Sequence, residues 1–102
     1  MLAIISARQA EITELCRRFH VRRLDVFGSA TTGRFDAAVS DLDFAVELEL
    51  LPPVAYADAY FGLRDGLVAL FERPVDLVTT SSIVNPYFRA SLQATREPLY
   101  AA

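Results

Sequence analysis

Two aspartates spaced one residue apart are the side chains of this sequence best suited to do chemistry. Asp41 and Asp43 flank Leu42 at the start of an alternating apolar segment. On a strand, residues two positions apart share a face, so the Cβ atoms of these two residues would lie about 6–7 Å apart, and the two anions would repel by roughly 2.5–3 kcal/mol at an effective dielectric of 20. Folding gains nothing from that repulsion. A divalent cation offsets it, because Mg²⁺ binds one or two carboxylates together with substrate phosphates.

Two further features would complete such a site. The turn Gly28-Ser29 precedes the aspartate pair, and Asp76 interrupts a later apolar run. If the three strands are neighbours, three carboxylates converge beside the turn, as a two-metal phosphoryl-transfer site requires. Gly28 lets the backbone approach a phosphate, and the Ser29 hydroxyl with the N–H groups at a helix start can donate to it. Alone, each feature is an ordinary turn or solvated strand residue; their order and spacing together indicate a site.

The elements that must position these residues can be read from periodicity and turn signals. Alternation of apolar and polar residues predicts strands, and a 3–4-residue apolar spacing predicts helices. The resulting fold class is α/β (α+β): a small mixed sheet of three or four strands with helices mainly on one face. The double proline at positions 52–53 breaks regular structure, and Asn85-Pro86 predicts a helix start. The expected elements are helix 7–19, strand 24–27, loop 31–40, strand 42–48, helix 56–72, strand 75–78 and helix 87–100, the last frayed or kinked at Pro98.

Length and composition limit the classes of protein to which this sequence can belong. The 102 residues fit a single domain spanning 1–102, and the net charge of −3 gives no electrostatic footprint for direct DNA binding. The apolar fraction of 53% and mean hydropathy of +0.28 fit either a well-filled core or a face covered by another chain. Cys16, the only cysteine, lies on an apolar helix stripe and predicts a buried, inert thiol. No signal peptide or membrane span is expected, so we predict a cytoplasmic protein.

The motifs resemble those of a known family. Gly28-Ser29, the run Ser40-Asp41-Leu42-Asp43-Phe44 and the strand Val75-Asp76-Leu77-Val78 resemble the minimal nucleotidyltransferases (MNT) of the DNA polymerase β superfamily. The likeness extends over essentially the whole chain and implies a polymerase-β-like nucleotidyltransferase fold. It also implies that Asp41 and Asp43 bind Mg²⁺, as one or two ions. Asp76 would complete the metal site and help to deprotonate the acceptor hydroxyl, and Gly28 and Ser29 would hold the β- and γ-phosphates of a nucleoside triphosphate.

One departure from the family pattern bears on activity. The family often has Ala-Arg-Gly after its Gly-Ser turn, whereas this chain reads Thr31-Thr32-Gly33-Arg34. Thr32 occupies the usual arginine position, so a phosphate-contacting cation is either missing or supplied by Arg34. The departure concerns catalytic competence rather than fold.

The resemblance also suggests a biological setting. Many small proteins with these motifs resemble the antitoxin of HEPN–MNT toxin–antitoxin pairs, which implies transfer of AMP from ATP to a tyrosine of a HEPN-type ribonuclease toxin. The residues fit this reading, since a chain this short has no separate domain to hold an acceptor. Two alternatives stay open: a catalytically weak antitoxin that neutralises its partner by occlusion, and a metal-binding structural domain without nucleotide. Homo- and hetero-oligomers are both compatible with the sequence, which does not indicate a nucleotide preference.

Overall fold

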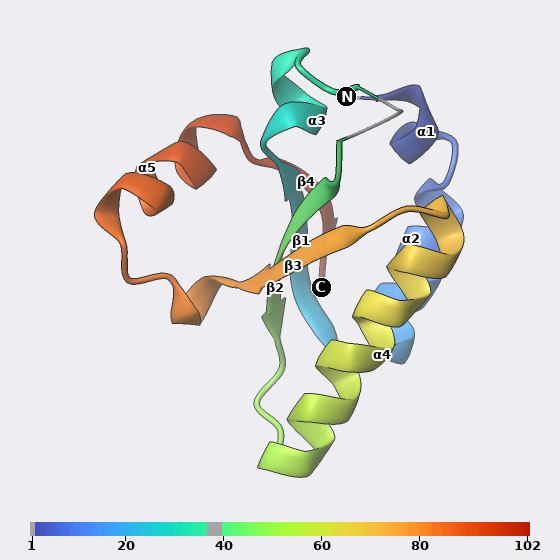
Figure 1. Cartoon of the computed structure of the whole chain (residues 1–102). Helices are drawn as coiled ribbons and strands as arrows, with labels where there is room; N and C mark the ends of the chain where they lie inside the picture. Colours follow the sequence, from blue (N-terminus) through green and yellow to red (C-terminus); the bar gives the residue numbers. More distant parts are fainter. Residues whose placement is uncertain (1, 37–39) are drawn as a thin grey trace.

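The structure, a computed structural model, describes residues 2–36 and 40–102 (Figure 1). Helices and strands alternate along most of the chain, as the sequence predicted. The helices are α1 (Ala3–Ser6), α2 (Gln9–Arg18), α3 (Ser29–Thr32), α4 (Pro53–Phe71) and α5 (Pro86–Thr95), with a 3₁₀ turn η1 (Thr80–Ser82) before α5. The strands are β1 (Val21–Phe27), β2 (Leu42–Leu48), β3 (Val75–Thr79) and β4 (Glu97–Ala101).

The four strands form one mixed sheet in the order β3-β2-β1-β4. β1 pairs antiparallel with β2 and with β4, whereas β2 and β3 are parallel. The parallel pair follows from the connection between its strands, because α4 carries the chain back along the sheet before β3 begins. This arrangement confirms the predicted mixed α/β class and sets β2, which carries Asp43, between β1 and β3.

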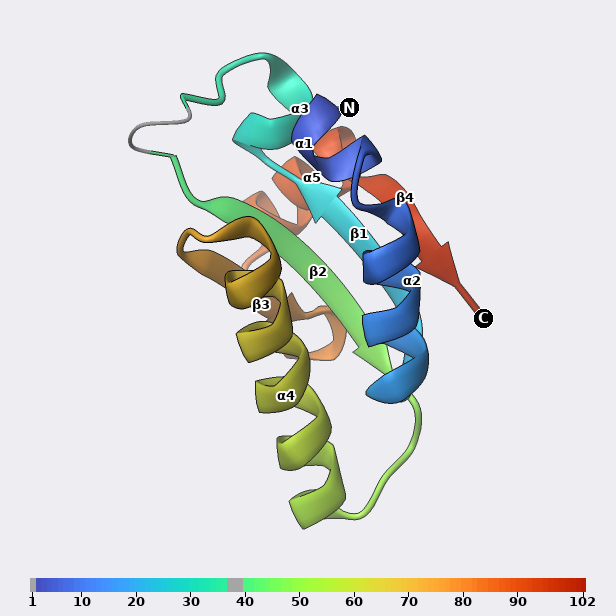
Figure 2. The same cartoon turned by 90° about the vertical axis from the view of Figure 1, so that its right-hand side faces the viewer.

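Helices α2 and α4 lie side by side on one face of the sheet (Figure 2). The alternating residues Leu42, Phe44 and Val46 of β2 point into this layer and are fully buried. Cys16 of α2 also lies there, and its burial raises the pKa of the thiol to about 12. The expectation that the Cys16 thiol is buried is therefore confirmed.

The opposite face of the sheet is covered only in part. Helix α5 lies on this side, and its Leu92 packs with Phe27, Ala45 and Ile83 in a second, smaller core. Most other residues of α5 are exposed. The helices thus lie mainly on one face, and part of the second face is left open. None of the helices described is long and apolar enough to cross a membrane.

The C-terminal segment differs from the sequence prediction. The expected helix over residues 87–100 ends at Thr95, and residues 97–101 form β4 at the edge of the sheet. Pro98 is compatible with this strand because an edge strand can leave one side without ladder hydrogen bonds. It therefore marks a change of element rather than a kink.

Smaller differences occur near the other predicted boundaries. The expected loop over residues 31–40 begins inside α3, and its residues 37–39 lie outside those described. Pro53 opens α4 instead of breaking regular structure, since proline lacks only an N–H that is unbonded at a helix start. The expected first helix over residues 7–19 is present as α2, Gln9–Arg18, and the short helix α1, Ala3–Ser6, which was not predicted, precedes it.

Candidate active site

Asp43 and Asp76 lie side by side on the open face of the sheet. They are register partners across the parallel strands β2 and β3. Neighbouring strands are about 4.8 Å apart and residues in register point to the same face, so the two carboxylates are close neighbours. Asp43 is partly buried, whereas Asp76 is exposed. The topology therefore brings together two acidic residues that are 33 positions apart in the sequence.

Asp41 adds a third negative charge to this pair. It is exposed and directly precedes β2. The pKa of Asp43 is raised from 3.8 to about 6, chiefly because burial penalises its charge and further because Asp76 and Asp41 repel it. Asp43 is thus the carboxylate on which the charges of the other two act. Within residues 2–36 and 40–102, however, no three His, Cys, Asp or Glu side chains already stand where they could hold a metal ion.

The Gly28-Ser29 turn lies directly against Asp43. Gly28 follows β1, in which Phe27 is the register partner of Asp43. Its φ of 73° and ψ of −140° suit glycine alone, and a Cβ added there would stand 2.7 Å from Oδ2 of Asp43. Glycine is therefore required both by the backbone conformation and by the adjacent carboxylate. Ser29 begins α3 immediately afterwards.

The turn is stabilised by α3. The Gly28 carbonyl accepts hydrogen bonds from the Thr31 amide and from the Thr31 hydroxyl, each at 3.0 Å. Gly33, with a φ of 77°, ends the helix in the left-handed conformation that glycine adopts readily. The short helix α3 therefore determines the direction of the chain after Gly28.

Arg34 and Thr32 lie farther along the same segment. Thr32 is the exposed last residue of α3, and Arg34 is exposed in the stretch that follows. In the part of the chain that is described, no ion pair connects Arg34 with Asp41, Asp43 or Asp76. Its assignment to a bound phosphate stays a prediction.

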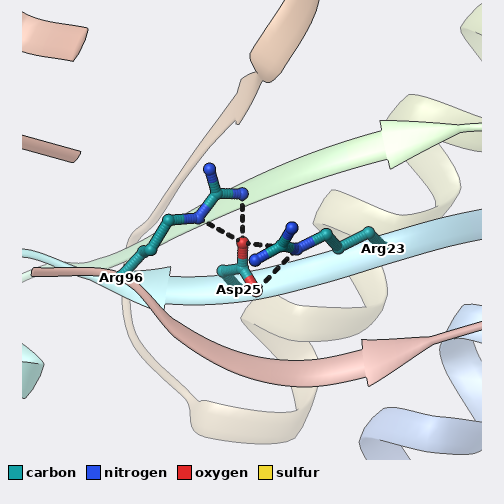
Figure 3. A network of polar contacts seen from close by, with 3 residues as sticks. All are labelled: Arg23, Asp25 and Arg96. Atoms are coloured by element: carbon teal, nitrogen blue, oxygen red, sulfur yellow. Dashed lines mark hydrogen bonds and ion pairs between the residues drawn. The ribbon is translucent and has the colours of Figure 1, made fainter. Parts of the chain in front are cut away.

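A buried ion pair on the same face of the sheet as Asp43 was not predicted from the sequence. Asp25 of β1 is fully buried, and Arg96 holds its carboxylate through Nε, 2.6 Å from Oδ2, and through Nη2 (Figure 3). Arg23 reaches the same carboxylate, with its Nε 3.0 Å from Oδ2. Asp25 interrupts an apolar run just as Asp76 does, and that signal in Leu24-Asp25-Val26 could have identified it.

Residues 11–97 match the family described as "Nucleotidyltransferase domain". This chain belongs to that family. None of the curated protein sequences compared with this nucleotidyltransferase domain matches it.

Solved structures give the same family context. A protein assigned as a minimal nucleotidyltransferase is 28% identical with a TM-score of 0.67, and the match covers 91% of this domain and 90% of that chain. A chain from a toxin–antitoxin structure with AMP-PNP has a TM-score of 0.66 at 22% identity, covering 92% and 73% of the two chains. Another comes from a tri-AMPylated Shewanella oneidensis HEPN toxin in complex with its MNT antitoxin, with a TM-score of 0.64 at 20% identity and coverage of 96% and 73%. At these identities the likeness is one of fold: this nucleotidyltransferase domain is folded like the chains matched in these two toxin–antitoxin structures.

Proposed function

We propose that this nucleotidyltransferase transfers AMP from ATP to a tyrosine hydroxyl of a HEPN-type toxin and silences that partner as its antitoxin. The observation that carries the proposal is the position of Asp43. It lies beside Asp76 on one side and against the Gly28 turn on the other. Carboxylates for a cation thereby adjoin a backbone turn suited to phosphate. The AMP-PNP and AMPylated-toxin complexes among the similar structures support ATP as the nucleotide.

Asp41, Asp43 and Asp76 are the residues that would hold Mg²⁺. All three offer hard oxygen donors. The pKa of Asp43 is raised by burial and, in addition, by repulsion from Asp76 and Asp41, and a dication would relieve that repulsion. An incomplete protein cage is compatible with magnesium, which keeps several waters and takes further ligands from substrate phosphates. When bound, magnesium would neutralise triphosphate charge during the transfer.

The transfer itself requires one nucleophile and one leaving group. The tyrosine oxygen attacks the α-phosphorus of ATP, the bond from that phosphorus to the bridging oxygen of the β-phosphate breaks, and pyrophosphate leaves. Asp76, which is exposed on the open face, takes the hydroxyl proton. Gly28 and Ser29 hold the β- and γ-phosphates, and Arg34 supplies the cation that Thr32 cannot.

An exposed apolar surface next to the site supports delivery of the acceptor by another protein. Val84 and Tyr87 are each 86% exposed, and Phe88 is 39% exposed. The Phe88 ring packs edge-on against Phe27, with centroids 5.9 Å apart, and Phe27 directly precedes Gly28. A partner that covered these residues would lie close to the turn and would form a hetero-oligomer with this chain.

The test is transfer of label from [α-³²P]ATP to a purified HEPN partner in the presence of Mg²⁺. We expect the partner to become labelled and Asp43→Asn to abolish the labelling. The matched control is Asp65→Asn, because Asp65 is an exposed aspartate on α4, away from the open face. Absence of label with the unmodified chain would refute the proposed transfer.

Occlusion without catalysis is the second candidate function. Two observations favour it: Thr32 in place of the usual arginine, and the lack of a preformed three-residue metal site within the described residues. If Asp43→Asn still neutralises the toxin as well as the unmodified chain does, occlusion is the correct reading. If nucleotide does not bind at all, the domain is a structural one.

A further inference from the structure

The Thr95 hydroxyl connects the end of α5 to the Gly28 turn. The Gly28 N–H donates to Thr95 Oγ1 at 3.1 Å, across 67 positions of sequence. The same hydroxyl donates to the Ser91 carbonyl at 2.9 Å. Its proton is thus directed back into α5, which leaves an oxygen lone pair facing Gly28. This long-range contact differs from the usual bond of a helical threonine, which involves only its own helix.

Gly28 is therefore held from two directions. Its Cα faces the Asp43 carboxylate, and its N–H is bonded to Thr95. Rotation of the Gly28 peptide would change both the approach of the turn to Asp43 and the direction in which Ser29 begins α3. The Thr95 hydroxyl fixes that rotation.

Thr95 is itself anchored by its neighbour. Arg96 donates its backbone N–H to the Leu92 carbonyl at 2.9 Å, and its guanidinium binds the fully buried Asp25. Figure 3 shows Arg96 and Arg23 meeting this carboxylate from either side. Because a buried charge is strongly held by its partner, the end of α5 is fixed to β1. The Thr95 hydroxyl cannot drift away from Gly28 while this pair is intact.

We propose that Thr95 is a positioning residue for nucleotide binding: its hydroxyl orients the Gly28-Ser29 turn that receives the triphosphate. This inference rests on the function proposed above. Removal of the hydroxyl would leave the Gly28 N–H without its partner and allow the turn to rotate. Affinity for nucleotide should then fall, whereas affinity for the partner protein should not change.

The experiment compares Thr95→Val with Thr95→Ser in the full chain. Valine keeps the shape and removes the hydroxyl, whereas serine keeps the hydroxyl. The matched control is Thr13→Val on α2, at the other face of the sheet, where Thr13 accepts a bond from the Gln9 side chain at 3.3 Å. Two quantities are measured for each protein: amide hydrogen exchange at Gly28 without nucleotide, and the Kd for Mg²⁺ with AMP-PNP by calorimetry.

We expect Thr95→Val to speed exchange at Gly28 and to raise the nucleotide Kd about five- to tenfold, the effect of one lost hydrogen bond. Thr95→Ser should stay within about twofold of the unmodified chain. Faster exchange with an unchanged Kd would overturn the inference, because the bond would then be structural only. If the unmodified chain binds no AMP-PNP, the proposed function fails first, and that failure is visible before any variant is examined.

Discussion

Neutralising Asp43 should stabilise the metal-free protein while removing its function. The change is Asp43→Asn, which keeps the size of the side chain and deletes its charge. In the folded chain that charge is penalised by burial and repelled by Asp76 and Asp41. A residue retained for stability would behave in the opposite way, so the sign of the effect separates a functional carboxylate from a structural one.

The size of this stabilisation follows from the raised pKa of Asp43. A rise from 3.8 to about 6 corresponds to about 3 kcal/mol at 1.36 kcal/mol per pH unit. Because Asp43 is partly exposed, solvent screening reduces this to about 1 kcal/mol. For a domain of this length, that free energy raises the unfolding midpoint by about 4–8 °C.

The effect of Asp43→Asn on stability should also depend on pH. Since the pKa is higher in the folded chain than in the unfolded chain, the folded state binds more protons between about pH 4 and pH 6. The contribution of Asp43 to stability is therefore unfavourable above pH 6 and disappears as the pH falls towards 4. The gain from Asp43→Asn should be present at pH 7.5 and absent near pH 4.

The assay is thermal unfolding followed by circular dichroism in the presence of a chelator, with Asp65→Asn as the control. Asp65 is exposed on α4, and its substitution should change stability by less than about 0.5 kcal/mol. Adding Mg²⁺ with AMP-PNP should then raise the midpoint of the unmodified chain but not that of Asp43→Asn. A loss of stability in the metal-free Asp43→Asn protein at pH 7.5 would show that the Asp43 charge stabilises the fold.

Three further outcomes follow from the packing. Asp25→Ala should lower the free energy of unfolding by about 3–5 kcal/mol, because it leaves Arg96 with an unpaired, largely buried charge. A loss under about 1 kcal/mol, measured by urea unfolding, would contradict this. Gly62→Ala should lower the free energy of unfolding by about 1–3 kcal/mol, because the added Cβ would overlap three atoms of the Phe19 ring between α2 and α4. An unchanged free energy of unfolding in urea would show that this packing is loose. Cys16 should react with a thiol reagent only as fast as the chain unfolds, since its thiol is buried and its pKa is raised to about 12; rapid modification of the folded protein would argue against its burial.

The central part of the fold was predictable because its signals are local. In β2 every second residue is apolar, and this alternation requires Asp43 to face away from the core that buries Phe44. The same reasoning assigns Asp76 to the open face. The close approach of these two residues then follows from the α4 crossover, which makes β2 and β3 parallel.

The parts that were missed depend on contacts between distant segments. Residues 97–100 were predicted as the end of a helix, whereas pairing of β4 with β1 and the ion pair between Arg96 and Asp25 make this segment a strand. The bond from Gly28 to Thr95 spans 67 positions and has no sequence pattern of its own. Secondary-structure propensity describes only residues that are neighbours in sequence, and in this segment the tertiary contacts override it.

The most direct test of the central claim is a titration of the carboxyl ¹³C resonances with Mg²⁺ and AMP-PNP. We expect the resonances of Asp41, Asp43 and Asp76 to shift together along one binding curve, while those of Asp58 and Asp65 on α4 stay unchanged. If the three resonances do not move, or if they move no more than those on α4, the open face of the sheet is not the magnesium–nucleotide site.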